Sequence, residues 1–216
     1  MQPLLPSDSN SPKVAVLNLG GDNFQSLTDL LTESGAAVQI TSSPEEMLDM
    51  SGLVIHGVGA FADVMDRVNQ LNLSGIIDKR LTRDKSVLGI GTGMHVLFER
   101  QLESEVKGLG QWPGVIERLI SAPLPHVGMA QVEGDSNSIL LRGMPAEEFY
   151  FDHTFAVNNW ELDIRPPFQP AAISYVTYGE RFLAAVENGP LCATQFHPEK
   201  SGPAGLQLLK NWVASL

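Results

Sequence analysis

Two segments of the sequence place residues that could carry out acyl-transfer chemistry at the ends of predicted strands. The first is VLGIGTGMH at residues 87–95, an apolar run that leads into three closely spaced glycines and an apolar-periodic segment. This pattern predicts a strand, a tight turn and a helix, the arrangement of a nucleophile elbow. The central position of the elbow is Gly91, which has no side chain.

The second segment is ATQFHPEKS at residues 193–201, where His197 and Glu199 follow another apolar run. An imidazole and a carboxylate two residues apart could form a general base and the group that orients it. Taken alone, the pair is more often structural. Gly57-Val58-Gly59, after a third apolar run, could direct backbone N–H groups at an oxyanion, although it fits a simple tight turn equally well.

Two other residues could replace the missing nucleophile, and both are disfavoured. Side chains alternate along a strand, so Cys192 is expected to point away from the face that carries residues 193, 195 and 197. Thr92 is nearer to the turn, but its hydroxyl would need strong activation. At this position of an elbow, the backbone N–H rather than the side chain contributes to the oxyanion hole.

The composition indicates one cytoplasmic domain. A chain of 216 residues, 43% of them hydrophobic, is long enough for one substantial core. Its net charge of −11 argues against nucleic acid or a membrane surface as the main partner. The single cysteine suits a reducing compartment, and no apolar run approaches the roughly 18 residues of a membrane span. We expect a flexible N-terminal tail over residues 1–12 and one domain over 13–216.

Strand-like and helix-like segments alternate through the first half of the chain. Strands are expected at 14–19, 37–41, 53–56 and 87–90, and helices at 23–35, from residue 44, and over 62–84. Such alternation predicts a mostly parallel sheet whose site lies at the carboxyl ends of its strands. Shorter β-rich pieces follow residue 108, and a last amphipathic helix runs to Leu216.

Six motifs occur in the order found in one enzyme family. They are Gly21-Asp-Asn-Phe-Gln-Ser26, Gly57-Val-Gly-Ala-Phe61, Gly108-Leu-Gly110 with Pro113-Gly114, Pro125-His-Val-Gly128, Tyr150-Phe-Asp-His153 and Gln195-Phe-His-Pro-Glu-Lys-Ser201. This set resembles the class I glutamine amidotransferases, specifically the glutaminase subunits of bacterial imidazole glycerol phosphate synthases. The resemblance implies a flavodoxin-like α/β fold, with a mostly parallel central sheet flanked by helices, and no cofactor.

The resemblance also assigns roles to the chemical residues. In the family a Cys–His–Glu triad releases ammonia from glutamine, and the ammonia passes to a barrel-type cyclase subunit in a heterodimer. By position, His197 is the base, Glu199 orients it, and Gly91 stands where the family has its cysteine. Gly57, Val58, Gly59 and Thr92 correspond to the oxyanion hole.

The resemblance places further residues around the substrate and the partner. Glu103 falls where relatives hold the substrate's amino group, whereas His95 replaces a substrate-binding glutamine, so glutamine binding is doubtful. His56 replaces a proline, and Met129-Ala130 replaces Trp-Asn on the partner-facing side. Positions near the partner interface or the ammonia entry are retained as Tyr150, His153 and Lys200. If selection for glutaminase activity had ended, sequence drift would explain the replacements at Gly91, His95, His56 and Met129-Ala130 together.

The histidines raise the question of a metal site. His56, His95 and His197 are expected to approach the pocket left by the missing thiol, and imidazoles beside a carboxylate can bind zinc. Their spacing is dispersed, unlike a compact ligand motif. The favoured interpretation is polar filling of the pocket, and no metal is predicted.

Three functions remain open. The first is the amidotransferase-type subunit of an imidazole glycerol phosphate synthase-like complex in histidine biosynthesis, defective in glutamine hydrolysis. The second is a non-catalytic binding or regulatory module derived from the family. The third, less favoured, is a hydrolase that uses another nucleophile or a metal.

Overall fold

The computed structural model describes residues 11–20, 24–120, 123–144, 146–158, 160–162 and 169–216. Most of the tail expected over residues 1–12 lies outside these ranges. So does the Gly21-Asp-Asn23 part of the first motif.

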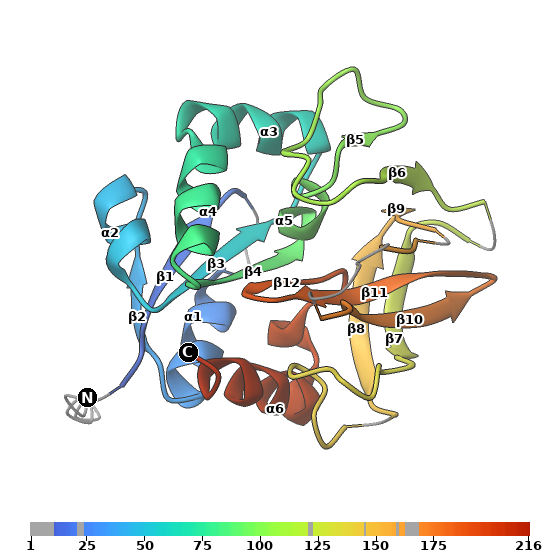
Figure 1. Ribbon diagram of the computed structural model, residues 1–216. Coiled ribbons are helices and arrows are strands. Elements are labelled where there is room, and N and C mark those ends of the chain that lie inside the picture. The colour runs from blue at the N-terminus through green and yellow to red at the C-terminus, as the bar shows by residue number, and fades with distance from the viewer. Residues whose placement is uncertain (1–10, 21–23, 121–122, 145, 159, 163–168) are drawn as a thin grey trace.

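A seven-stranded sheet forms the centre of the protein, in the order β10-β11-β12-β4-β3-β1-β2 (Figure 1). The neighbours from β12 to β2 pair in parallel, whereas β10 and β11 extend the sheet antiparallel. The seven strands are β1 (Lys13–Asn18), β2 (Ala37–Ile40), β3 (Gly52–Gly57), β4 (Ser86–Gly91), β10 (Ala172–Tyr178), β11 (Glu180–Asn188) and β12 (Leu191–Thr194). The order β2-β1-β3-β4-β12 is that of flavodoxin-like folds, so the predicted fold class is confirmed.

Helices cover both faces of the sheet (Figure 1). One face carries α1 (Phe24–Glu33) and α6 (Gly202–Val213), and the other carries α2 (Pro44–Asp49), α3 (Phe61–Gln70) and α4 (Leu73–Thr82). Successive residues of β1 pack on opposite faces of the sheet. Val14 belongs to the core that contains Leu27 of α1, and Ala15 belongs to the core that contains Val64 of α3. Burial on both faces explains why these strands read as nearly continuous apolar runs.

The helix expected over 62–84 is in fact two helices, α3 and α4. They are separated by Leu71 and Asn72, and Asn72 has left-handed backbone angles of φ 49° and ψ 45°. Asparagine is one of the few residues that adopts this conformation at low cost. Hydrophobic periodicity continues across the break, which is why the sequence does not reveal it.

Smaller β elements lie beside the carboxyl ends of the central strands (Figure 1). β7 (His126–Gln131) and β8 (Glu148–His153) form an antiparallel hairpin. β6 (Val115–Arg118) pairs with β5 (Arg100–Gln101) and with β9 (Phe155–Ala156). The short α5 (Thr92–His95) follows β4, and the 3₁₀ turn η1 (Pro198–Lys200) comes between β12 and α6.

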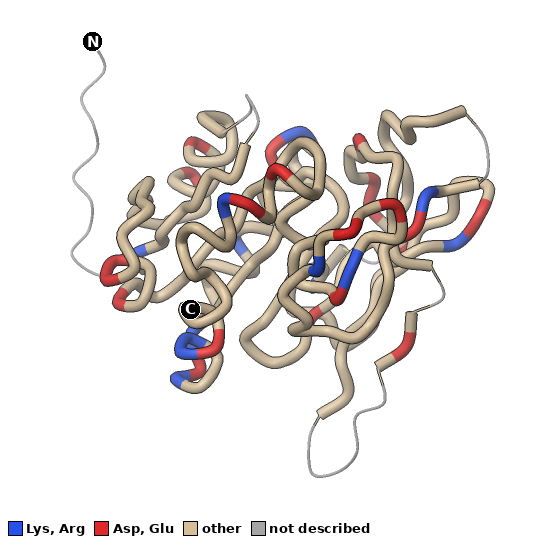
Figure 2. Tube along the Cα trace, turned by 90° about the horizontal axis from the view of Figure 1, so that it is seen from above, with Lys and Arg blue, Asp and Glu red and all other residues tan. Residues whose placement is uncertain are grey.

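Acidic and basic positions are interspersed along the trace, and the basic ones are spread over several elements (Figure 2). Within the described ranges, no helix has the length and apolar character needed to cross a membrane.

Candidate active site

Gly91 lies at the junction of β4 and α5, as the elbow pattern predicts. Its backbone angles are φ 61° and ψ −122°, a conformation that is strained for residues with a side chain. A Cβ atom added there would lie 3.1 Å from Cε1 and 3.4 Å from Nε2 of His197. A side chain on Gly91 would therefore begin next to the imidazole that the sequence identifies as a base.

His197 and Glu199 form the expected pair. His197 precedes η1, and its Nδ1 donates to Oε1 of Glu199 at 2.8 Å. With Nδ1 held in this way, Nε2 remains on the side of Gly91. Burial by itself raises the pKa of Glu199, but the hydrogen bonds from His197 and His56 outweigh burial and lower that pKa to about 2. Glu199 is therefore a carboxylate at neutral pH.

His56 provides a second contact to the same carboxylate oxygen. Its Nε2 lies 3.2 Å from Oε1 of Glu199, and both side chains are fully buried. His56 does not line the cavity in front of Gly91. The expectation that His56 approaches that pocket is wrong, because β3 directs its imidazole behind His197, against Glu199.

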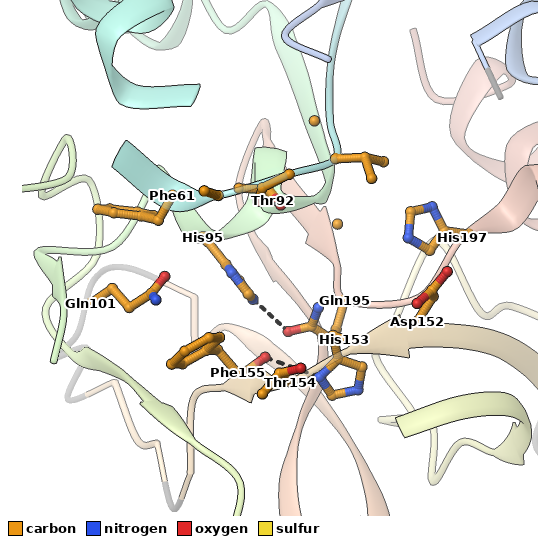
Figure 3. A pocket seen from close by; sticks show the side chains of 15 residues that line it. Phe61, Thr92, His95, Gln101, Asp152, His153, Thr154, Phe155, Gln195 and His197 are labelled. Atoms are coloured by element: carbon orange, nitrogen blue, oxygen red, sulfur yellow. Dashed lines mark hydrogen bonds between the residues drawn. The ribbon is translucent and has the colours of Figure 1, made fainter. Parts of the chain in front are cut away.

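A cavity of about 290 Å³, with Gly91 in its lining, opens beside Thr92, His95 and His197 (Figure 3). It is lined by residues 57–61, 91–92, 95, 101, 152–155, 195 and 197. His95 donates from Nε2 to Oε1 of Gln195 at 2.7 Å across one wall. Burial lowers the pKa of His95 to about 4, so the imidazole is neutral near pH 7. The cavity thus presents polar but mostly uncharged groups beside the His197–Glu199 pair.

The candidate oxyanion loop lines the cavity but does not offer all of its donors. Gly57 is the β3 residue paired with Gly91 across the sheet. The N–H of Val58 donates to the carbonyl of Gly20 at 3.2 Å, so this donor is engaged within the chain. The hydroxyl of Thr92 lies 3.4 Å from the carbonyl of Gly59, to which it donates. That contact directs the hydroxyl to the loop.

Glu103 lies outside the cavity. Its carboxylate is half exposed and lies 4.0 Å from Arg118, and Gln101, two residues earlier, lines the cavity instead. The sequence also did not single out Thr154 or Phe155, which lie in β9 or just before it and form part of the wall. No local pattern marks these residues, because they reach the cavity through the pairing of β9 with β6, a strand almost 40 residues earlier in the chain.

The exposed face of the β7–β8 hairpin brings together most of the predicted partner-facing residues. Met129, 49% exposed, is directly opposite Tyr150. Nζ of Lys200 lies 5.0 Å from the centre of the Tyr150 ring and 3.5 Å from Oδ2 of Asp152. His153 differs from the expectation, since alternation along β8 buries it in the cavity wall.

Cys192 occupies the position that alternation predicts. It packs in the core beside α6, whereas Ala193 packs in the core on the opposite face of the sheet. Burial raises the pKa of the Cys192 thiol, with a smaller contribution from Glu187. The thiol is remote from the cavity and not disposed to ionise.

Within the described part of the chain, one group of His, Cys, Asp and Glu side chains has ligand atoms close enough to share a metal ion. It consists of His56, His197 and Glu199.

The elbow, the His–Glu pair and the sheet define the class of protein. The family model described as glutamine amidotransferase class-I matches residues 15–216. Solved structures agree in fold: one described as a glutamine amidotransferase aligns with a TM-score of 0.70 at 18% identity, covering 94% of this chain and 99% of the other. The PurLQS structure from Thermotoga maritima aligns with a TM-score of 0.68 at 15% identity, covering 95% and 99%.

Relatives of higher sequence identity point to a narrower group within this family. The imidazole glycerol phosphate synthase subunit HisH of Leifsonia xyli subsp. xyli is 47% identical over 208 residues, 95% of this chain and 100% of the relative. The subunit of the same name from Nocardia farcinica is 48% identical over 206 residues, 94% and 98% of the two chains. The chain therefore belongs to the class I glutamine amidotransferase family, and within that family it is similar to these HisH subunits.

Proposed function

We propose that this chain is the amidotransferase-type subunit of an imidazole glycerol phosphate synthase complex in histidine biosynthesis, and that it does not hydrolyse glutamine by covalent catalysis. The relatives at 47% and 48% identity support the complex. The absence of a side chain at Gly91 supports the loss of hydrolysis. A nucleophilic side chain at this position would begin 3.1 Å from the His197 ring, and glycine supplies none.

Neither of the two residues considered as substitutes offers a nucleophile to the cavity. The Thr92 hydroxyl is directed to Gly59, and Cys192 is buried in the other core layer. In a serine protease, loss of the triad nucleophile costs about 10⁶ in turnover. Incubation with a glutamine-directed electrophile and intact mass spectrometry is expected to show no adduct. Stoichiometric labelling of Thr92 or Cys192 would contradict the proposal.

The proposed docking face is the exposed side of the β7–β8 hairpin, namely Val127, Met129, Tyr150 and Asp152, together with Lys200. Its apolar members are well exposed, Val127 at 54% and Met129 at 49%. Asp152 belongs both to this face and to the cavity lining, so the cavity reaches the docking face. A barrel-type cyclase subunit seated there would contact the mouth of the cavity.

Docking is tested by size-exclusion chromatography with light scattering, using the chain mixed with the cyclase subunit of its own source. We expect a one-to-one complex at tens of micromolar that Lys200→Glu weakens. Lys210→Glu, on the exposed side of α6, is the matched charge reversal and should leave the complex intact. A chain that stays monomeric under these conditions would contradict the subunit role.

The second candidate is a non-catalytic binding or regulatory module with a different partner. The contact between Lys200 and Asp152 favours it, because the lysine already has an acidic partner within the chain. Failure to bind the cyclase subunit, with an intact fold, would select this alternative.

A further inference from the structure

We propose that His56, Glu199 and His197 form a binding site for a divalent transition-metal ion such as zinc. This site is independent of the proposed partner and of the loss of glutamine hydrolysis. It rests on the arrangement of three buried side chains from two separate parts of the chain.

The ligand atoms already lie close to one another. One atom from each side chain lies within 4.8 Å of the other two. Nε2 of His56 and Nδ1 of His197 lie 3.2 and 2.8 Å from Oε1 of Glu199. Neighbouring ligands of a tetrahedral zinc ion with bonds of about 2.0–2.1 Å are about 3.3 Å apart. The two distances to Oε1 would change by about half an ångström or less, and the ligand atoms of the two imidazoles, within 4.8 Å of each other, would approach by up to about 1.5 Å.

The ligand types suit such an ion. Imidazole nitrogens bind zinc, copper, iron and nickel, and two histidines with one glutamate form a known zinc ligand set. Oε2 of Glu199 is buried and has no hydrogen-bond partner among the described residues. That oxygen, or a water molecule, could complete the coordination.

The electrostatics of the group also favour a cation. The Glu199 side chain is fully buried, and within the described ranges its only ion-pair partners are the two imidazoles. If both imidazoles are neutral, the carboxylate is a buried negative charge held by two hydrogen bonds but by no positive charge, which is costly. A divalent ion would supply the positive charge without protonating either ring.

The position of the site indicates a structural role for the ion. His197 would bind through Nδ1, which leaves Nε2 on the Gly91 side and places the metal behind the cavity. The ion would join the end of β3, which carries His56, to the turn after β12, which carries His197 and Glu199. We therefore assign it a stabilising role.

The test uses the untagged chain, treated with a chelator, dialysed, and titrated with Zn²⁺ in competition with a chromophoric chelator. We expect one equivalent to bind, a rise in the thermal unfolding midpoint, and visible absorption bands with Co²⁺. His56→Gln keeps a side-chain N–H near Glu199 but removes the imidazole. It should weaken Zn²⁺ binding by at least about 100-fold, because even residues that only support a ligand are worth about 10–100-fold.

Two further variants locate the ion. His95→Gln removes another buried imidazole, one that bonds to Gln195 outside the proposed site, and should leave binding unchanged. His153→Gln breaks the separate pair in which Nδ1 of His126 lies 3.1 Å from Nε2 of His153. Binding that survives His56→Gln, binding lost only in His153→Gln, or no stoichiometric binding by the unmodified chain would each overturn the proposal. If the unmodified chain bound no stoichiometric Zn²⁺, the three side chains would form a hydrogen-bonded cluster and not a metal site.

Discussion

Substitution of Gly91 by cysteine restores a nucleophile at the elbow and tests the proposed loss of chemistry directly. The new Cβ would contact His197 at 3.1–3.4 Å, so the thiol would lie within reach of the imidazole. We expect measurable glutaminase activity in Gly91→Cys where the unmodified chain has none. We also expect a less stable protein, because a side chain at φ 61° carries about 1–3 kcal/mol of backbone strain.

The single substitution should restore only part of the turnover. A triad nucleophile is worth about 10⁶ in turnover, and one missing oxyanion donor costs about 10²–10³. The Val58 N–H is engaged by the Gly20 carbonyl, so one candidate donor is absent from the hole. Gly91→Cys is therefore expected to recover about 10³–10⁴ of the 10⁶ and to remain about 10²–10³ below a competent relative.

The assay measures ammonia release with the cyclase partner present, alongside the Leifsonia xyli HisH subunit with its own partner. Intact mass after a glutamine-directed electrophile should show one adduct in Gly91→Cys. Cys192 is an internal control, because its buried thiol should stay unlabelled. The triple variant Gly91→Cys/His95→Gln/His56→Pro should exceed the single one. Turnover in Gly91→Cys equal to that of the relative would refute the reasoning about Val58, His95 and His56.

Three further predictions concern stability and docking. Gly91→Ala should lower the free energy of unfolding in urea by more than Gly110→Ala, which has a similar φ of 63° but open space around its Cβ. Equal losses would show that the contacts of the new Cβ with the Gly57 carbonyl and the His197 ring add nothing. Burial lowers the pKa of His95 from 6.5 to about 4, so the unfolded state binds this proton first and stability should fall by on the order of 3 kcal/mol as pH drops from 6.5 to 4. His95→Gln should make that decline shallower, and an unchanged pH profile would argue against a neutral buried imidazole. Met129→Trp should tighten cyclase binding by about 1–2 kcal/mol in calorimetry, since tryptophan is a strong interface anchor, and unchanged affinity would place Met129 outside the interface.

Strand periodicity carried most of what the sequence revealed. Apolar runs located the parallel strands, and the carboxyl ends of β3 and β4 meet at Gly57 and Gly91 as the fold requires. Alternation after residue 191 correctly separated Cys192 from the face of Gln195 and His197. These inferences succeeded because a strand fixes the direction of every second side chain.

The remaining errors concern residues whose position depends on distant segments. Glu103 lies in irregular chain after β5, where no period fixes its direction, and it faces Arg118 instead of the cavity. Alternation along β8 would have separated His153 from Tyr150, had that segment been recognised as a strand. The contact between His56 and Glu199 spans 143 residues and has no local signal.

The changes at Gly91 and His56 meet in one network of side chains. His197 faces the Gly91 notch with one side of its ring and Glu199 with the other, and His56 occupies the same carboxylate oxygen. A histidine that shares the orienting carboxylate competes with the base for its negative charge, which would burden a working triad. If the chain does not hydrolyse glutamine, as proposed, that competition carries no catalytic penalty. The His56–Glu199 contact is therefore compatible with the proposed absence of glutamine hydrolysis, and it gives the fully buried carboxylate a second hydrogen-bond partner.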